Sequence, residues 1–476
     1  MTKSQRTALA VLSAAMLMTI LDGSIVTVAM PAIQEDLGFS PAGLSWTVNA
    51  YLIAFGGLLL LAGRLGDLIG RKTMFVTGTV VFTTASVLAG VASTPAVLIA
   101  ARFLQGVGSA IAASVVLGIL VTIFTEPRQR ATAIGVFSFT GAAGASIGQV
   151  LGGVLTDALN WHWIFLINVP IGILTVLVAV QALPADRGLG WSAGADVLGA
   201  VLVTVGLMLG IYTVVEVERY GWFSAHTLGL GALAAALLAA FVLRQATAAS
   251  PLLPLRILRS REVSGANAVQ MLTLAAMFAF QIIVALYLQK VLGYNALQTG
   301  LAMLPAAVAI GGVSLFASAR LITRFGERAV LVAGLALLLA GMSWLTRLPV
   351  DAGYLTDVLP VMVAVAGGGL VLPALTALGM SGADADDAGL ASGLFNTTQQ
   401  VGMAIGVAVL STLAAARTGT ELVAGASDAD ALTSGYRLAF TVAAGLLVAA
   451  LIVSVTVLRT RHTSEDTTMA PAVPAL

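Results

Sequence analysis

Long apolar segments recur along the whole chain and are separated by short polar ones. An α-helix needs about 20 apolar residues to cross the hydrocarbon core of a bilayer, and fourteen segments come close to or exceed this length between polar residues and helix breakers. The pattern therefore predicts an all-α integral membrane protein with fourteen transmembrane helices. We place these helices near residues 8–33, 45–64, 74–93, 96–123, 131–156, 162–183, 197–216, 225–243, 264–289, 298–319, 329–346, 355–379, 390–416 and 435–458.

The first segment resembles a secretion signal only at its start, where Lys3 and Arg6 precede the apolar run. The run from 8 to 33 is longer than the apolar region of a signal peptide, and it contains a carboxylate, Asp22. We therefore expect a retained first helix. After the last helix, the polar composition of residues 459–476 predicts a disordered tail in the cytoplasm.

The basic residues divide unequally between the two sides of the predicted bundle. With the N-terminus inside, seventeen Lys and Arg residues lie in inner segments and five in outer segments, and Arg102 lies inside a helix, which accounts for all 23. Cytoplasmic loops of membrane proteins carry such an excess. Both termini of this multi-pass protein are therefore predicted to be cytoplasmic.

Charge and composition exclude several classes of protein. Only 23 basic and 22 acidic residues occur among 476, which is 9%, whereas soluble domains carry about a quarter. A net charge of +1 gives no electrostatic footprint for nucleic acid. The chain has no cysteine and only three scattered histidines, so we expect no disulfide and no metal site. We also expect no cofactor.

Two parts of the chain repeat each other at a constant offset of 258 residues. Parallel repeats of this kind build transporters from two similar halves. We therefore expect an N-terminal six-helix bundle (1–190), two inserted linker helices (191–262) and a C-terminal six-helix bundle (263–458). The matching residues are Gly135, Phe137, Thr140, Gly144, Ile147 and Gly148 in the first half and Gly393, Phe395, Thr398, Gly402, Ile405 and Gly406 in the second.

Five motifs in chain order carry a family resemblance. They run from Leu21 to Pro31, from Gly63 to Lys72, from Arg102 to Gly108, from Gly144 to Gly153 and from Trp161 to Pro170. With these motifs the sequence resembles the fourteen-helix drug:proton antiporters of the major facilitator superfamily over nearly its whole length. The resemblance implies two six-helix bundles that rock about a central site and use the proton gradient as their energy source.

Asp22 and Arg102 are charged residues in the middle of predicted helices. An ionised carboxylate near the bilayer centre costs roughly 2.5–3.5 kcal/mol on insertion scales, which suits Asp22 to taking up a proton. Arg102 cannot release its proton and is a natural partner for Asp22. In the family the matching residues are implicated in coupling to protons or substrate. The alternatives are a permanently neutralised carboxylate and a structural link between helices 1 and 4.

The segment from Gly63 to Lys72 joins the second and third predicted helices. Its glycines allow close packing and a sharp turn, and the resemblance implies a cytoplasmic gate. Leu68 stands where the family usually has arginine, and Thr323 replaces the acid in the second copy, so we expect the first copy to carry the gate. A loop that only sets topology is the alternative. The predicted gate residues are Gly63, Asp67, Gly70 and Arg71.

Small residues line one face of the fifth predicted helix and would let another helix approach closely. In the family this face is the antiporter signature, which is proposed to seal the pathway against leak. Gln149 stands where the family usually has proline, so the expected kink is absent, and ordinary helix packing is the alternative. The residues of this motif are Gly144, Gly148, Gly152 and Gly153.

Neutral polar and aromatic residues are the candidates for a substrate cavity. Some family members that export dications carry extra acids in helices 10 and 13, where this sequence has none. We therefore expect a small hydrophobic substrate that is neutral or carries one positive charge. Hydrogen bonding between helices is the alternative role of the polar residues. The candidates are Trp46, Asn49, Phe137, Phe278, Gln281, Phe395, Asn396, Gln399 and Gln400.

The expected function is efflux of hydrophobic drugs or antibiotics across the cytoplasmic membrane of a bacterium, by a monomer that exchanges them for protons. An exporter of an endogenous metabolite, with drug resistance incidental, is the alternative. A receptor or a membrane-embedded enzyme is more remote. The nearest thing to a catalytic cluster is Asp384, Asp386 and Asp387, which are more typical of a solvated turn.

Overall fold

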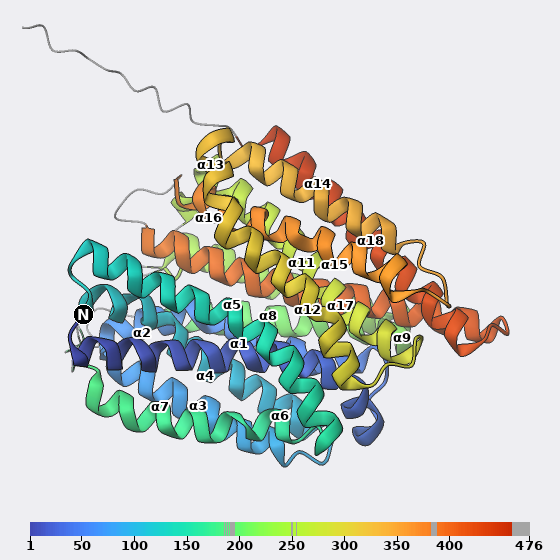
Figure 1. The fold of residues 1–476 in the computed structure, drawn as a ribbon, viewed down its shortest axis with the longest axis horizontal. Coiled ribbons are helices and arrows are strands. Elements are labelled where there is room, and N and C mark those ends of the chain that lie inside the picture. Colours follow the sequence, from blue (N-terminus) through green and yellow to red (C-terminus); the bar gives the residue numbers. More distant parts are fainter. Residues whose placement is uncertain are drawn as a thin grey trace, which may run out of the picture.

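The computed structural model describes residues 1–184, 186, 188, 190, 196–248, 251–253, 255–381 and 388–458. These residues form helices and turns without any strand (Figure 1). Thirteen helices among them are long and apolar enough to cross a membrane, and α5 (Pro127–Ala158), with 32 residues, is long enough to be the fourteenth. The predicted all-helical membrane fold is confirmed. The predicted tail, 459–476, lies outside the described residues.

The N-terminal half contains six spanning helices. Glycines bring some of them into backbone contact: a Cβ on Gly108 of α4 would lie 2.5 Å from the Phe82 nitrogen of α3, so only glycine permits this approach. The elements are α1 (Lys3–Leu37), η1 (Gly43–Ser45), α2 (Trp46–Ile69), α3 (Arg71–Gly90), α4 (Pro95–Ile123), α5, and α6 (Trp163–Leu166) continuing as α7 (Asn168–Ala182).

The C-terminal half repeats this plan with more interrupted helices. Two π-helical turns, η4 (Ser314–Ser318) and η5 (Tyr354–Val358), interrupt or begin spanning segments. The other elements are η3 (Leu255–Arg259), α11 (Arg261–Lys290), α12 (Ala296–Val313), α13 (Ala319–Phe325), α14 (Glu327–Leu345), α15 (Leu359–Ala364), η6 (Val365–Gly367), α16 (Gly368–Ser381), α17 (Ala388–Val423) and α18 (Asp428–Thr456).

The inserted segment forms two further spanning helices at the seam between the halves. α8 (Val197–Val215) packs against α2 of the first half and α17 of the second, and α10 (Ala225–Thr247) packs against α8. A short helix, α9 (Val217–Tyr220), joins them. Only 11% of the most apolar stretch of α10 is buried, so this helix lies at the periphery. The division of the chain at 190 and 262 stays a prediction.

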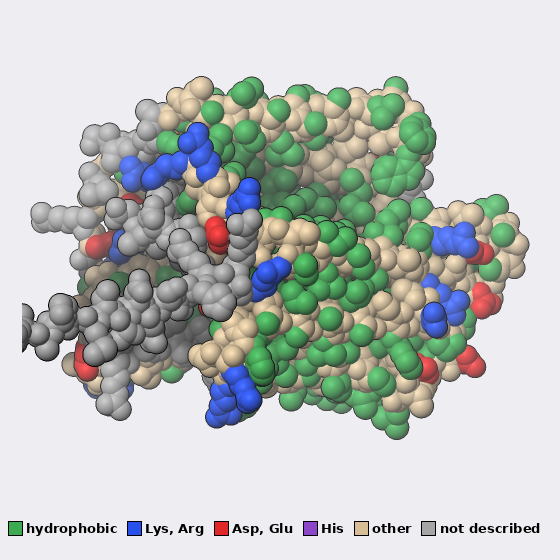
Figure 2. Space-filling model, turned by 90° about the horizontal axis from the view of Figure 1, so that it is seen from above, with side chains coloured by type: hydrophobic (Ala, Val, Ile, Leu, Met, Phe, Trp, Pro, Cys, Tyr) green, Lys and Arg blue, Asp and Glu red, His purple; other side chains and the backbone are tan. Residues whose placement is uncertain are grey.

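The surface has the pattern of a multi-pass membrane protein. Charged side chains gather toward the two ends of the long axis, with mostly hydrophobic side chains between them (Figure 2). Leu174, Leu243 and Phe316 are 63%, 68% and 73% exposed, as expected for side chains that face lipid in place of water. We call the end that carries Arg71 and Lys72 the basic end, and the opposite end, which carries Asp157 and Lys290, the far end.

One hydrophobic core belongs to both halves. It joins Ile25 of α1 and Ile53 of α2 to Ile282 of α11 and Val407 of α17, and it includes Ile211 of α8. A second core lies within the C-terminal half, and a third lies within the N-terminal half and includes Phe75 and Leu120. The shared core joins the halves over part of their length and leaves room for a cavity elsewhere.

Candidate functional site

Asp22 and Arg102 form an ion pair in the interior of the N-terminal half. Their side chains, on α1 and α4, are 0% and 1% exposed. Arg102 Nη1 donates to Asp22 Oδ2 at 2.5 Å, and Arg102 Nε donates to the Thr47 carbonyl oxygen of α2 at 2.7 Å. Withdrawing two charges from water is costly, so the pair is compensated by further contacts.

Two amide side chains complete the shell of the carboxylate. Gln105 Nε2 and Asn168 Nδ2 each donate to Asp22 Oδ1 at 3.0 Å. Gln105 also accepts from Arg102 Nη1 at 2.7 Å and donates to Ser86 Oγ at 2.8 Å. Because residues three apart share one helix face, Arg102 and Gln105 reach the same carboxylate. Asn168 reaches it from the start of α7.

Aromatic rings cover the guanidinium. The Cζ of Arg102 lies 4.6 Å from the ring centre of Tyr51 and 5.7 Å from that of Phe165. Such cation–π contacts strengthen when water is excluded. The Tyr51 hydroxyl in turn donates to Ser109 Oγ at 3.0 Å. The charged centre is therefore a closed network of side chains from α1, α2, α3, α4, α6 and α7.

The glycine face of α5 lies against α1 beside this network. A Cβ on Gly148 would lie 2.9 Å from the Leu21 carbonyl oxygen, and one on Gly152 would lie 2.8 Å from that of Ile25. Gly144 faces Leu17 at 3.2 Å. Gly153 points the other way, where a Cβ would lie 2.5 Å from Leu297 Cα of α12. The motif therefore packs α5 against both halves.

A cavity of about 880 Å³ lies between the halves toward the basic end. Side chains from α1, α2, α4, α5 and α17 line it, and Thr19 and Ile20 bring it within one turn of Asp22 on α1. Four of the predicted cavity residues line it, namely Phe137, Asn396, Gln399 and Gln400. Five others lie outside its lining, namely Trp46, Asn49, Phe278, Gln281 and Phe395.

Several of those five have other packing roles. Asn49 is fully buried and donates to Ser45 Oγ at 3.3 Å, while Trp46 and Phe278 pack against the shared core. The Phe395 ring packs against the C-terminal core. Sequence reasoning missed the lining residues Met16 and Phe55 because apolar residues facing a cavity look like apolar residues facing lipid.

The predicted gate segment lies at the mouth of the cavity. Gly63, Asp67 and Arg71 line it. Arg71 Nη1 donates to the Gly118 carbonyl oxygen at 3.3 Å, and Arg71 Nη2 lies 3.4 Å from Asp67 Oδ1. Gly70 has a φ of 112°, which disfavours a side chain. The partners of Arg71 named here lie in the N-terminal half.

Asp186 anchors the turn at Gly70. Its carboxylate accepts from the backbone nitrogens of Arg71 at 2.7 Å and Lys72 at 3.1 Å. These are the first residues of α3, where a negative charge is favourable. The sequence offered no signal for this contact, because 115 residues separate Asp186 from Arg71.

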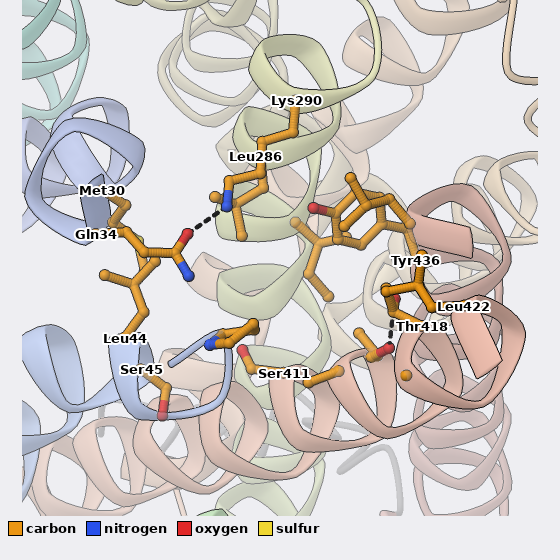
Figure 3. Close-up of a pocket in the computed structure, with 16 residues that line it drawn as sticks. Met30, Gln34, Leu44, Ser45, Leu286, Lys290, Ser411, Thr418, Leu422 and Tyr436 are labelled. Carbon is orange, nitrogen blue, oxygen red and sulfur yellow. Dashed lines mark hydrogen bonds between the residues drawn. The ribbon is translucent and has the colours of Figure 1, made fainter. Parts of the chain in front are cut away.

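The halves are hydrogen-bonded to each other at the far end. Gln289 Nε2 of α11 donates to the Val28 carbonyl oxygen of α1 at 3.0 Å. The ammonium of Lys290 donates to Gln34, and both side chains line a pocket of about 170 Å³ (Figure 3). Asp157 at the end of α5 accepts from the Leu297 nitrogen of α12 at 2.9 Å. The halves therefore meet at the far end, and the larger cavity separates them toward the basic end.

Within the described ranges no cluster of three or more His, Asp or Glu side chains could hold a metal ion. The acids at 384, 386 and 387 lie outside these ranges.

Comparisons with known proteins agree with this architecture. The puromycin resistance protein of Streptomyces alboniger is 36% identical over 473 residues, which cover 98% of this chain and 93% of the relative. The cephamycin export protein of Amycolatopsis lactamdurans is 38% identical over 454 residues, covering 94% and 93%. The tetracenomycin C resistance and export protein of Streptomyces glaucescens is 33% identical over 404 residues, covering 85% and 74%.

Solved structures share the fold at low sequence identity. A bacterial homologue of the human lysosomal transporter Spinster has a TM-score of 0.67 and 16% identity, covering 97% of this chain and all of its own. An auto-inhibited POT family peptide transporter has a TM-score of 0.68 and 15% identity, covering 97% and 98%. The family model described as Major Facilitator Superfamily matches residues 12–407. The chain belongs to the Major Facilitator Superfamily.

Proposed function

We propose that this protein exports hydrophobic antibiotic-like compounds across the cytoplasmic membrane in exchange for protons, by alternating access. Relatives that cover nearly the whole chain are named for resistance to puromycin and export of cephamycin. Others are named for resistance to methylenomycin A and for multidrug transport. Similarity over whole chains supports a shared activity, although the individual substrates differ.

The observation that carries the proposal is a buried ion pair one helical turn from a large cavity between two halves. The cavity has apolar walls, including Met16 and Phe55, and amides at Asn396 and Gln400. Its acidic lining residue, Asp67, lies beside Arg71 at the mouth. Such a lining favours a largely apolar compound, held mainly by burial of apolar surface, and the proposed substrate is neutral or carries one positive charge.

Proton uptake at Asp22 would change its contacts. A neutral carboxyl would hold Arg102 less strongly and would have to rearrange the donors on its two oxygens. Because α1 packs on the glycines of α5, and α5 packs on α12 through Gly153, a shift of α1 would reach the interface between the halves. Interfaces of this kind switch between discrete arrangements, which is the coupling that antiport requires.

The orientation of the protein belongs to the same proposal. The basic end carries Arg71 and Lys72 and would face the cytoplasm, with both termini there. The cavity would then receive substrate from the cytoplasm or the inner leaflet. The far-end contacts of Lys290 and Asp157 would break when the protein opens outward. A bacterial monomer without a cofactor, driven by the proton gradient, completes the proposal.

A second candidate is export of a compound that the cell itself makes. The cephamycin export protein and a probable actinorhodin transporter of Streptomyces coelicolor, 37% identical over 433 residues, favour it. Deleting the gene would then make a defined product accumulate without broad drug sensitivity. The transport mechanism is the same in both cases.

The decisive experiment uses the purified protein in lipid vesicles. Export of puromycin and of ethidium is measured with and without an imposed proton gradient. We expect transport to follow the gradient in the wild type and in Asp36→Asn, a control on the same helix whose carboxylate is 57% exposed. Asp22→Asn should lose gradient-driven export while it is still found in the membrane. Equal rates with and without the gradient in the wild type would refute proton coupling.

A further inference from the structure

A short segment that follows the two inserted helices in the chain lines the cavity of about 880 Å³ between the halves. α8 lies at the seam formed by α2 and α17, and α10 lies against α8. Residues 251–253, which we call the return segment, lie between α10 and η3 along the chain. Pro251 and Leu252 of the return segment line the cavity, and Leu252 is only 5% exposed. Among the lining residues, these two come from neither six-helix half.

A hydrogen-bonded clamp fixes the position of this segment. The carboxylate of Asp196, at the start of α8, accepts from Arg244 Nε at 3.0 Å and from Gln245 Nε2 at 2.8 Å. Gln245 Oε1 in turn accepts from the backbone nitrogen of Leu253 at 2.9 Å. Asp196 and Gln245 are 4% and 3% exposed, and buried charge-assisted hydrogen bonds are strong.

The other side of the segment is held by apolar packing. Leu253 contacts a small cluster formed by Ile257, Val263 of α11 and Leu394 of α17. The segment is therefore held by α10 through Gln245 and by the C-terminal half through Leu253. Because the adjacent Leu253 is held through both its backbone nitrogen and its side chain, the Leu252 side chain has a defined place in the cavity wall.

The composition of the cavity wall indicates what the Leu252 side chain does for a bound compound. The same cavity also has small or polar lining residues on α2, namely Gly63, Arg64 and Asp67. Leu252 adds apolar contact area to the cavity wall, and its bulk limits the width of a compound that lies beside it. In hydrophobic pockets, one methylene more or less changes the preference for one compound over another by about ten-fold or more.

We propose that Leu252 is a specificity-determining residue of the export cavity, where it contacts the bound compound and limits the bulk of the hydrophobic molecules that are accepted. The inserted helix pair thereby acquires a role, because it carries and anchors this side chain. The inference rests on the proposed function, since it assumes that exported compounds occupy this cavity.

The chain has no cysteine, so single-cysteine variants report on one position each. Leu252→Cys is compared with Met16→Cys, a lining position on α1, and with Leu258→Cys, a nearby position that is 39% exposed and outside the lining. Full-length variants in inverted membrane vesicles are labelled with N-ethylmaleimide, with and without saturating puromycin or ethidium. We expect either compound to slow labelling at Met16→Cys and Leu252→Cys by roughly ten-fold and to leave Leu258→Cys unchanged.

Each other result has a separate meaning. Protection of Met16→Cys without protection of Leu252→Cys would overturn the inference and leave the proposed function standing. Protection at neither lining position would contradict occupation of the cavity, and the proposed function would fail together with the inference. Equal protection of Leu258→Cys would indicate a global change of conformation and would also overturn the inference.

Transport selectivity provides an independent readout. Leu252→Ala should raise export of a bulky compound relative to a small one by roughly ten-fold, and Leu252→Trp should lower the same ratio. Gln245→Leu removes the acceptor of the Leu253 nitrogen and should therefore also raise the ratio of bulky to small compound exported. Leu258→Ala should leave this ratio unchanged. A uniform change for all compounds, with normal amounts of folded protein, would argue against a role in specificity.

Discussion

The sharpest energetic prediction concerns the loss of Arg102. Replacing it with methionine removes the guanidinium that donates to Asp22, Gln105 and Thr47, while the aliphatic side chain still fills part of the space. Among the described residues, Asp22 then keeps the two amide donors, from Gln105 and Asn168. Breaking a buried pair by removing one partner typically costs 3–5 kcal/mol, because the remaining charge is uncompensated.

The double variant Asp22→Asn/Arg102→Met separates this cost from simple loss of packing. Replacing both charges of a buried pair is often nearly neutral. We therefore expect Arg102→Met to lose about 3–5 kcal/mol and the double variant to recover most of it. Arg71→Met serves as a matched control, because the Arg71 side chain is 38% exposed and pairs with a carboxylate that is 45% exposed. Exposed pairs contribute about 1 kcal/mol or less.

The assay is reversible unfolding of the purified protein by titration with SDS, followed by tryptophan fluorescence. Free energies of unfolding for the four proteins of the cycle give the coupling energy between Asp22 and Arg102. A coupling of about 3 kcal/mol agrees with the structure. If the two single changes simply add, or if Arg102→Met loses no more than Arg71→Met, the ion pair does not hold the six-element network together and the reasoning fails.

Three further changes test other parts of the molecule. Gly148→Val places a side chain about 2.9 Å from the Leu21 carbonyl oxygen and should destabilise the protein by about 1–3 kcal/mol through overpacking, measured by the same titration. Asp196→Asn should cost about 1–3 kcal/mol at neutral pH. Burial raises the pKa of Asp196, but hydrogen bonds from Gly199, Gln245 and Arg244 outweigh this and lower it, so the difference from wild type should persist above about pH 4 and vanish as the pH falls through the lowered pKa. Asp157→Ala removes the carboxylate that accepts from the first two backbone nitrogens of α12, and the loss of such a cap costs about 0.5–2 kcal/mol. Ala414 lines the same far-end pocket as Lys290, so Asp157→Ala should speed maleimide labelling of an added Ala414→Cys by several-fold. Unchanged labelling would exclude a role of Asp157 in far-end closure.

Local sequence patterns were sufficient to predict the spanning helices, the charged residues within them and the glycine motif. Fourteen apolar segments predicted the helices because a bilayer imposes one length on every span, and the observed bounds of α1, α4 and α11 extend only a few residues beyond the predicted ones. Asp22 and Arg102 stood out because charges are rare in the middle of such segments. The glycine motif of α5 was recognisable because small residues at helical spacing have few other uses in a membrane.

Spatial relations required the folded chain. Gln105 and Asn168 lie inside sequence motifs, yet only the fold brings both amides onto one carboxylate oxygen. Trp46 and Phe278 were expected in the substrate cavity, but they pack against the shared core, because an aromatic side chain reads the same whether it faces a cavity, a neighbouring helix or lipid. Leu252 was not predicted to line the cavity, because a leucine in the sequence also gives no sign of whether it faces a cavity, a neighbouring helix or lipid.

Sequence alone therefore determined the spanning segments and the rare charges within them, since both follow from the energy of placing a residue type in hydrocarbon. The tertiary structure decided which faces meet, where the cavity lies and what the inserted helices carry into it. These three features depend on contacts between residues far apart in the chain. The hydrophobic effect is non-directional, so the hydrophobicity of a segment does not specify its partner.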